Sequence, residues 1–384
     1  MKTKIDFSNP GHVKLCLLSQ GINVSSKKIF DSKKFAENQF PYGYSSELVK
    51  KFKKIPSELI LDNHVSVGIH LKADSPWTLR YNAEKNETLL FYKEKSGLKV
   101  QFNQQPCFYG KSLQNGLMSE NVGVMYGPHI LSLFSRGWCY FFTKELSCKF
   151  CSLKATRNLV GKNNVLTISP NNAAEVTKLA LSLDKERILY INHCAGSHKD
   201  HDLGVKLQID ILKAIKPLVP PEIRQHMMTM PPNDFRLFKT LRENGLGSLN
   251  MAIEVFDKKL FKNICPGKEK FFGYEKFLEA FGAAIKVFSN NTLYANFVGG
   301  LESLSSMAMG FEYFGKKGVA PSINVFHPDP KSVFYKKPRP SIEYLFEMVK
   351  AQSEIYSKYN FKPIFPIGGT RNSLDTEVYL NYFN

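Results

Sequence analysis

Three cysteines crowd a short stretch in the middle of the chain. Cys139, Cys148 and Cys151 all lie in GWCYFFTKELSCKFCSL, spaced C-x8-C-x2-C, while the other four of the seven cysteines are scattered along the sequence. An odd and dispersed set of cysteines is not the disulfide framework of a small secreted domain. Clustered thiols in such a chain bind zinc, hold an iron–sulfur cluster or carry out thiol redox chemistry.

These three chemistries make different demands on the sequence. Structural zinc takes four ligands, usually in two pairs, and without a second C-x2-C it would have to recruit a distant residue such as Cys194 or His193. A redox C-x2-C needs only Cys148 and Cys151 and leaves Cys139 without a role. A [4Fe–4S] cluster held by three thiolates uses all three and leaves one iron open for another ligand. The spacing fits the cluster best.

The elements that must position these thiols begin near residue 127, where strand and helix patterns alternate six times. Strand patterns cover 129–139, 187–194, 222–230, 248–256, 292–300 and 322–330, and helical patterns cover 171–185, 203–218, 233–247, 273–288, 303–318 and 341–359. This alternation predicts a parallel sheet with helices outside it. Polar residues, cysteines and glycines follow the strand ends, as at the mouth of a β/α barrel. Six units predict an α/β fold, a partial (β/α)6 TIM-type barrel.

The first 126 residues have a different texture. Short alternating or β-rich runs occupy 65–74, 77–83, 88–94 and 98–103. We therefore expect two parts: a smaller α+β or β-rich accessory domain over 1–126, and the partial barrel with a C-terminal extension over 127–384.

The charge balance of the chain indicates which kinds of partner it could bind. Lys and Arg number 52 against 34 Asp and Glu, a formal net charge of +18. Such a surface favours anionic partners, whether a small substrate, a peptide or a nucleic acid, although a solvated lysine-rich surface is the simpler interpretation because the charge is spread. The start of the chain has no long apolar stretch and no run of eighteen apolar residues occurs, so we expect a cytoplasmic protein without a membrane segment.

A six-unit β/α chain with three clustered cysteines after its first strand resembles the radical S-adenosylmethionine (radical SAM) superfamily. The family spacing is C-x3-C-x2-C, so this chain has a longer first gap, and lengthening a loop costs little closure entropy. The resemblance implies that Cys139, Cys148 and Cys151 hold a [4Fe–4S] cluster whose open iron binds the methionine part of S-adenosylmethionine. It further implies an enzyme that cleaves this cofactor reductively to a 5′-deoxyadenosyl radical, which abstracts hydrogen from a substrate.

The same resemblance assigns roles to residues near the strand ends. Phe150, just before the last cysteine, would lie near the adenine, and Glu254 in IEVFD would contact the ribose or the amino group. Other cofactor contacts would come from INHCAGS and NFVGG, namely Asn192, His193, Gly196, Asn296, Val298 and Gly299. Cys194 is the candidate catalytic residue, as a hydrogen-atom donor or ligand in the barrel mouth.

Two alternatives stay open. One is a metal-binding barrel scaffold without radical turnover, and the other is a radical SAM enzyme that modifies RNA or a peptide. The enzyme interpretation implies a small-molecule or peptide substrate and an external electron donor of the flavodoxin or ferredoxin kind.

Overall fold

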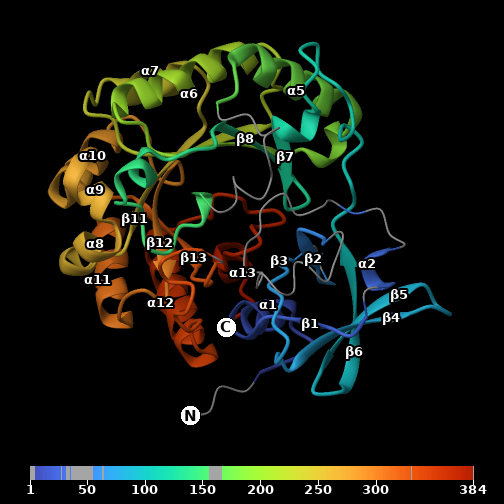
Figure 1. Ribbon diagram of the computed structural model, residues 1–384. Coiled ribbons are helices and arrows are strands. Elements are labelled where there is room, and N and C mark those ends of the chain that lie inside the picture. Colours follow the sequence, from blue (N-terminus) through green and yellow to red (C-terminus); the bar gives the residue numbers. More distant parts are fainter. Residues whose placement is uncertain are drawn as a thin grey trace.

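The computed structural model describes residues 5–26, 28–31, 35, 55–62, 65–154, 167–329 and 331–383, and it contains two sheets (Figure 1). The larger sheet has the strand order β13-β12-β11-β10-β9-β8-β7. Its members are β7 (Gly123–Tyr126), β8 (Ile130–Arg136), β9 (Tyr190–Ala195), β10 (Arg224–Thr229), β11 (Ser248–Glu254), β12 (Leu293–Gly299) and β13 (Ala320–Val325).

Strands β8 to β13 are all parallel and neighbours in sequence order, whereas β7 pairs antiparallel with β8 at the edge. The expected six-strand partial barrel is therefore confirmed. The reason lies in the strand sequences, since β12 is buried at every position and its neighbours nearly so, as strands covered on both faces must be.

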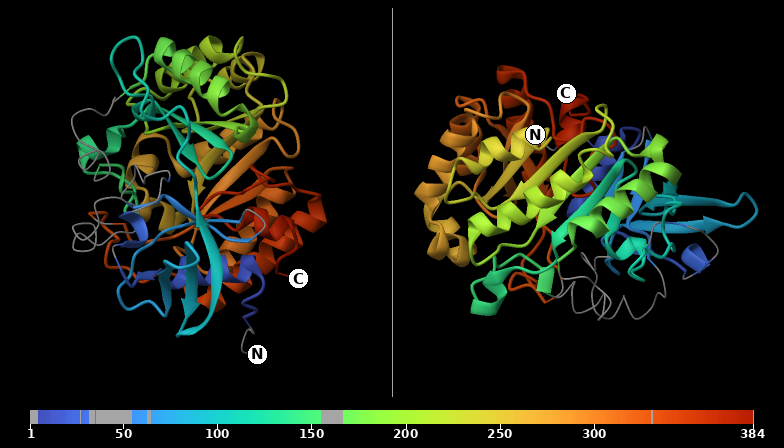
Figure 2. Two further views of the ribbon diagram at one scale, coloured as in Figure 1. Left: turned by 90° about the vertical axis from the view of Figure 1, so that its right-hand side faces the viewer. Right: turned by 90° about the horizontal axis from the view of Figure 1, so that it is seen from above.

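Helices cover the outside of this curved sheet (Figures 1 and 2). They are α5 (Pro170–Leu183), α6 (His201–Ile215), α7 (Leu237–Glu243), α10 (Tyr274–Ala284), α11 (Leu304–Gly315) and α12 (Ile342–Tyr359), and each overlaps an expected helical segment. Side chains of Ser169, Asp200, Ser303 and Ser341 cap four of them by accepting hydrogen bonds from backbone N–H groups of the first turn. Two short helices between β11 and α10 were not expected, α8 (Lys258–Ile264) and α9 (Pro266–Phe271).

The smaller sheet is built from the N-terminal part of the chain, in the order β1-β4-β5-β6-β2-β3. Its strands are β1 (Asn23–Val24), β2 (Glu58–Ile60), β3 (Ser66–Gly68), β4 (Trp77–Asn82), β5 (Glu87–Tyr92) and β6 (Lys95–Phe102), accompanied by the helices α1 (Pro10–Gln20) and α2 (Lys28–Asp31). Four of these strands, β3 to β6, overlap the expected runs. The division of the chain into an accessory domain over 1–126 and a barrel stays a proposal. Although β7 lies within residues 1–126, it pairs with β8 and so belongs to the larger sheet.

The C-terminal segment lies along the open edge of the partial barrel. Ser373 forms an isolated antiparallel bridge with Asn324, and the N–H of Val325 donates to the carbonyl of Asn372 at 2.8 Å. Farther along, α13 (Asp375–Tyr379) carries Glu377, whose carboxylate pairs with Lys14 of α1 at 2.8 Å. Helices α1 and α13 thus meet beside β13.

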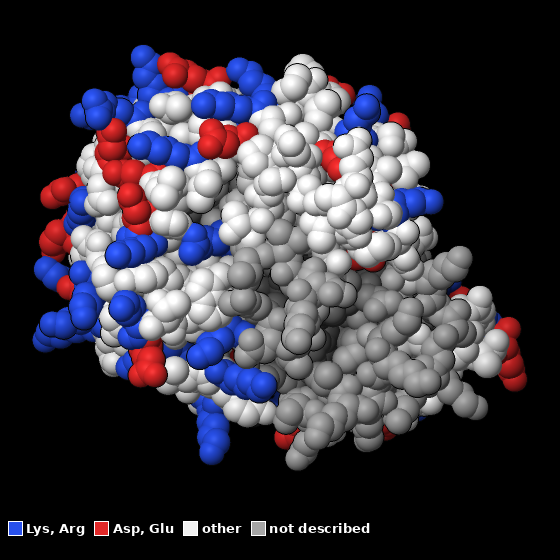
Figure 3. All heavy atoms as spheres, turned by 45° about the horizontal axis from the view of Figure 1, so that its top comes forward, with Lys and Arg blue, Asp and Glu red and all other residues white. Residues whose placement is uncertain are grey.

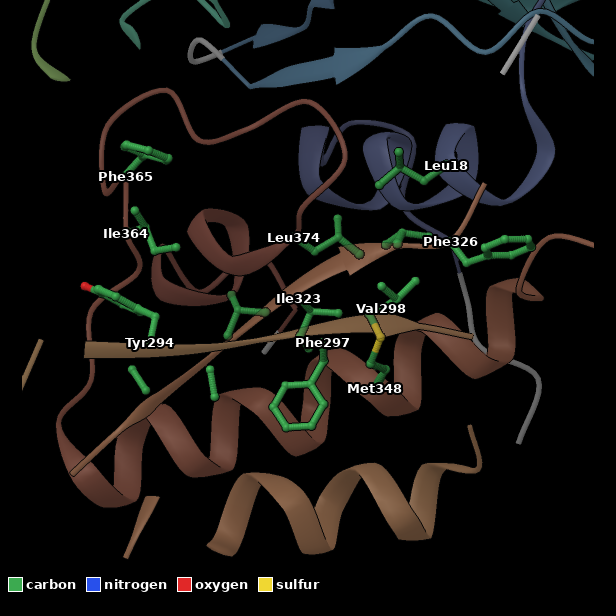
Figure 4. Close-up of a cluster of buried hydrophobic side chains, with 14 of the residues drawn as sticks. Leu18, Tyr294, Phe297, Val298, Ile323, Phe326, Met348, Ile364, Phe365 and Leu374 are labelled. Atoms are coloured by element: carbon green, nitrogen blue, oxygen red, sulfur yellow. The ribbon is translucent and has the colours of Figure 1, made fainter. Parts of the chain in front are cut away.

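Apolar packing joins these segments. Figure 4 shows Leu18 from α1, Leu374 from the C-terminal segment and Phe326 after β13 in one buried cluster. On the other side of the strands, Phe297 and Met348 pack between the sheet and the helices. Such contiguous burial is what fixes the strand ends relative to one another.

On the face drawn in Figure 3, basic side chains are interspersed with acidic ones. Within the described residues, none of the helices combines the length and the apolarity that crossing a membrane requires.

Candidate active site

The three clustered cysteines lie directly beyond the end of β8, in a segment we call the thiol loop, residues 137–151. Cys139 precedes a short 3-10 helix, η3 (Tyr140–Lys144), and Cys148 and Cys151 follow in the loop. Four backbone hydrogen bonds of 2.8–2.9 Å tie this loop to three neighbouring strand-end connections: Tyr140 N to Ser197 O, Lys149 N to Ile264 O, Gly267 N to Leu146 O and Phe334 N to Lys149 O. The loop is therefore held from several sides.

All three thiols are half-buried and act on one another electrostatically. Burial raises the pKa of Cys139, and burial together with the neighbouring Cys148 raises the pKa of Cys151. The pKa of Cys148 is lowered, first by a hydrogen bond from the thiol of Cys265 and also by the Lys268 ammonium. Cys148 thus has the environment of a thiolate, the form that binds metal.

The donor set fits an iron–sulfur cluster better than a single ion. Among the described residues, no three His, Cys, Asp or Glu side chains converge closely enough to hold one metal ion. Thiolates of a [4Fe–4S] cluster each bind a different iron, so they surround a volume and need not converge on a point. Three soft sulfur donors match that chemistry.

A cavity of about 340 Å³ opens beside the thiol loop at the carboxyl ends of the strands. Alternate residues of β8 to β13 line it, as the period of two along a strand requires. Eight of the residues singled out in the sequence are part of this lining: Phe150, Cys151, Asn192, Cys194, Gly196, Glu254, Asn296 and Val298. The structure therefore brings most of them to one chamber.

Gly196 has a steric role at the mouth. A Cβ atom built on it would lie 2.3 Å from the carbonyl oxygen of Trp138, the residue before Cys139. Its N–H donates to the carbonyl of Arg136 at 2.9 Å. Only glycine allows the end of β9 to approach the thiol loop this closely.

Glu254 stands at the end of β11 in an unusual backbone conformation. Its φ is +70°, which is uncommon for a residue with a side chain, and the register with β12 shifts at this point. Lys268 on α9 holds its carboxylate at 2.6 Å and also donates to the carbonyl of Ala252 at 2.5 Å. Strain of this kind collects at functional sites, where the surroundings hold the residue in place.

Two of the expected cofactor contacts do not face the cavity with a side chain. His193 lies on the opposite face of β9, where its Nε2 meets Gln225 Oε1 at 3.1 Å, and burial lowers its pKa to about 4. Gly299 packs toward α12, since a Cβ there would lie 2.5 Å from the sulfur of Met348. For both residues only a backbone contact with the cofactor stays open as a prediction.

Cys194 does line the cavity. Burial raises the pKa of its thiol to about 12, and its sulfur lies 3.1 Å from Nδ2 of Asn192. The thiol is protonated at neutral pH, which is the form a hydrogen-atom donor needs.

The sequence analysis missed a polar network at the same cavity beside the thiol loop. Ser152 Oγ donates to Asp329 Oδ2 at 2.6 Å, and His327 Nδ1 lies 2.7 Å from Asp329 Oδ1. Asn372 connects His327 at 3.1 Å with the buried His70 at 2.9 Å. The signal was present in HPDP after β13, but the partners come from four distant parts of the chain.

Buried polar atoms also lie deeper in the chamber. Asn192 Oδ1, His226 Nε2 and Asn250 Oδ1 are buried without a hydrogen-bond partner among the described residues, and all three residues line the cavity. Burial lowers the pKa of His226 well below its usual value, so its imidazole is neutral and presents an unpaired nitrogen. Unpaired buried polar atoms are costly and mark places where a ligand or water binds.

Comparison with known proteins bears on this geometry. The chain is 28% identical over 270 residues to the bacteriochlorophyllide c C-7(1)-hydroxylase of Chlorobaculum limnaeum, a match that covers 66% of each sequence. The matched region is thus just under two thirds of the length of that enzyme. This similarity, together with three thiols after the first strand of a six-stranded partial barrel, supports a radical SAM enzyme.

Solved structures with weak overall similarity include several enzymes. Methylornithine synthase gives a TM-score of 0.45 at 11% identity, covering 64% of this chain and 76% of the synthase. A radical SAM methyltransferase from Sphaerobacter thermophilus gives 0.39 at 12%, covering 77% of each chain, and coproporphyrinogen III oxidase from Escherichia coli gives 0.37 at 13%, covering 56% and 50%. No family model matches the sequence.

Proposed function

We propose that this radical SAM enzyme cleaves S-adenosylmethionine at a [4Fe–4S] cluster held by Cys139, Cys148 and Cys151, and removes a hydrogen from an organic substrate in the adjoining chamber. The observation that carries the proposal is the position of the thiol loop beside the 340 Å³ cavity, with Cys151 and Phe150 in its lining. When bound, the cluster and cofactor supply one electron and a 5′-deoxyadenosyl radical.

The residues of the chain have separable tasks in this proposal. Phe150 offers an aromatic face for the adenine, and Glu254, fixed by Lys268, accepts hydrogen bonds from ribose hydroxyls or the amino group. Asn296 and Val298 form the wall of β12, where adenine would pack. In this proposal the protonated thiol of Cys194 returns a hydrogen atom to a substrate radical, and the thiyl radical left on Cys194 takes an electron from the external donor and a proton to restore the thiol.

The floor of the chamber is the proposed substrate end. Asn192, His226 and Asn250 present unpaired polar atoms there, namely two amide oxygens that accept hydrogen bonds and one nitrogen of a neutral imidazole. Such a floor suits a substrate group that carries hydrogen-bond donors, such as a hydroxyl or amide. The expected anionic part of a substrate would then face the mouth and not the floor.

The first substrate class to test is the one named for the similar hydroxylase of Chlorobaculum limnaeum. The name of that enzyme describes hydroxylation of a bacteriochlorophyllide, and the match supports a substrate of the chlorin kind. A chlorophyllide that enters a site in the anaerobic protein shows shifted visible absorption bands, so its binding can be measured by absorption spectroscopy. We expect His226→Leu to weaken this binding at least tenfold and leave cofactor cleavage intact, because the imidazole lies in the floor.

The remaining partners follow from the proposed reaction. Reduction of the cluster requires an external one-electron donor of the flavodoxin or ferredoxin kind, and such chemistry belongs in a reducing compartment, the cytoplasm.

The cluster itself is tested by anaerobic reconstitution with iron and sulfide. We expect about four iron and four sulfide per chain, and an electron paramagnetic resonance signal of the reduced protein that changes when S-adenosylmethionine is added. Cys148→Ala should lose the intact cluster, whereas the matched control Cys107→Ala, at an exposed cysteine of the N-terminal part, should keep it. Equal iron content in both variants would refute the assignment of Cys148.

A further inference from the structure

A fourth cysteine lies against the thiol loop. Cys265 sits between α8 and α9, fully buried, and its thiol is a hydrogen-bonding neighbour of Cys148. The backbone fixes this approach, because Lys149 N donates to Ile264 O and Gly267 N donates to Leu146 O, each at 2.9 Å. Residues on both sides of Cys148 and of Cys265 are thus paired with one another.

A buried cation accompanies this thiol. Lys268, one turn further along α9, has a side chain only 8% exposed, yet its ammonium keeps two partners, Glu254 Oε1 at 2.6 Å and Ala252 O at 2.5 Å. Lys268 acts electrostatically on both Cys148 and Cys265. Burying a lysine is expensive unless it is paired, so its presence beside the thiol loop calls for a reason.

Hydrogen bonds to the sulfurs of an iron–sulfur cluster and nearby positive charge both stabilise the reduced, more negative form of the cluster. Burial in a medium of low polarity strengthens the effect of the hydrogen bond and of the charge on a neighbouring sulfur.

We propose that Cys265 and Lys268 are positioning residues for the cluster: the Cys265 thiol donates a hydrogen bond to the sulfur of Cys148, and the Lys268 ammonium raises the reduction potential of the cluster while fixing Glu254 at the cavity rim. This inference rests on the proposed function, since it assigns a role toward the cluster on Cys139, Cys148 and Cys151. Cys265 is then not an iron ligand, and the open iron stays free for the cofactor.

The test is the reduction potential of the reconstituted protein, followed by the electron paramagnetic resonance signal of the reduced cluster. We expect Cys265→Ala and Lys268→Met to keep full iron and sulfide content. At a fixed solution potential we expect the ratio of reduced to oxidised cluster to fall at least tenfold in Lys268→Met, a shift of about 59 mV for one electron, and by a smaller amount in Cys265→Ala. Cys265→Ser and Lys268→Arg, which keep the donor and the charge, should stay close to the wild type.

A matched control lies on the same helix. Lys270→Met removes an exposed charge from α9 and should leave the potential unchanged. Thermal unfolding of each variant shows whether it folds, and Cys265→Ser gives the decisive comparison with Cys265→Ala if the latter unfolds early.

Two results would overturn the inference while leaving the proposed function intact. One is an unchanged potential in Cys265→Ala and Lys268→Met with full clusters. The other is a loss of iron in Cys265→Ala as complete as in Cys148→Ala, which would make Cys265 a ligand. A wild-type chain that takes up no cluster would instead contradict the proposed function, and the inference with it.

Discussion

Ser152 donates a hydrogen bond of 2.6 Å to Asp329, which joins the residue after the last cysteine of the thiol loop to the segment after β13. Both side chains are buried, and the other carboxylate oxygen of Asp329 is held by His327. The connection crosses the mouth of the partial barrel and ties the first strand end to the last.

Removing this hydrogen bond should loosen the thiol loop. Ser152→Ala leaves one oxygen of the buried Asp329 without its donor, at a cost of about 1–3 kcal/mol of unfolding free energy. We expect a lower denaturant midpoint and a cluster that is lost faster on exposure to a chelator. Ser182→Ala, at an exposed serine late in α5, is the control, and an equal effect there would show that the Asp329 connection has no special weight.

Gly196→Ala should disturb the thiol loop directly. The added methyl group would lie 2.3 Å from the Trp138 carbonyl, and backbone on both sides must shift at a cost of about 1–3 kcal/mol. We expect reduced thermal stability together with lower iron content. Gly282→Ala on α10, where nothing lies within 4 Å of the added atom, should be neutral or stabilising by up to about 1 kcal/mol because alanine favours a helix. A normal iron content in Gly196→Ala would contradict the role assigned to this glycine.

Buried His193 should make stability depend on pH in the acid range. The folded protein keeps this imidazole neutral down to about pH 4, whereas an unfolded chain protonates it near pH 6.5. The unfolded state therefore binds more protons in this window, so the stability is present above pH 6.5 and is lost as the pH falls toward 4. Over the whole window the loss amounts to about 3 kcal/mol. His193→Gln should flatten this part of the profile measured by denaturant unfolding, and an unchanged slope would count against the buried neutral histidine.

The ion pair between Lys14 and Glu377 should anchor the two ends of the chain to the barrel. Both side chains are almost completely buried, so Lys14→Met leaves an uncompensated carboxylate and should cost about 3–5 kcal/mol of unfolding free energy. The exposed pair of Lys350 and Glu347 provides the comparison, where Lys350→Met should cost no more than about 0.5 kcal/mol. Similar costs at the two sites would show that the first pair is not buried in solution.

The barrel could be predicted because six strand patterns alternate with six helical patterns along the chain. Helix α1 was missed because its buried face contains Lys14, whose burial depends on Glu377 at the far end of the chain. No local pattern contains that information. The short helices α8 and α9 lie in a segment with few apolar repeats.

For the candidate site, the sequence alone predicts that its residues lie at the ends of the barrel strands. Alternation along β9 explains why Asn192 and Cys194 reach the cavity and His193 does not, and this could have been deduced from the two-residue period alone. The neighbours of the thiol loop could not have been deduced, since Cys265 reaches Cys148 only through backbone pairing between distant segments. The contact of His327 with Asn372 likewise depends on how the C-terminal segment runs along β13.

The central claim is tested most directly by the formation of 5′-deoxyadenosine. The reconstituted protein is incubated anaerobically with dithionite and S-adenosylmethionine, and the product is quantified by chromatography. The account predicts 5′-deoxyadenosine from the wild type and from Cys107→Ala, and none from Cys148→Ala. A wild-type protein that carries a full cluster yet forms no 5′-deoxyadenosine, or a Cys148→Ala variant that forms as much as the wild type, would contradict it.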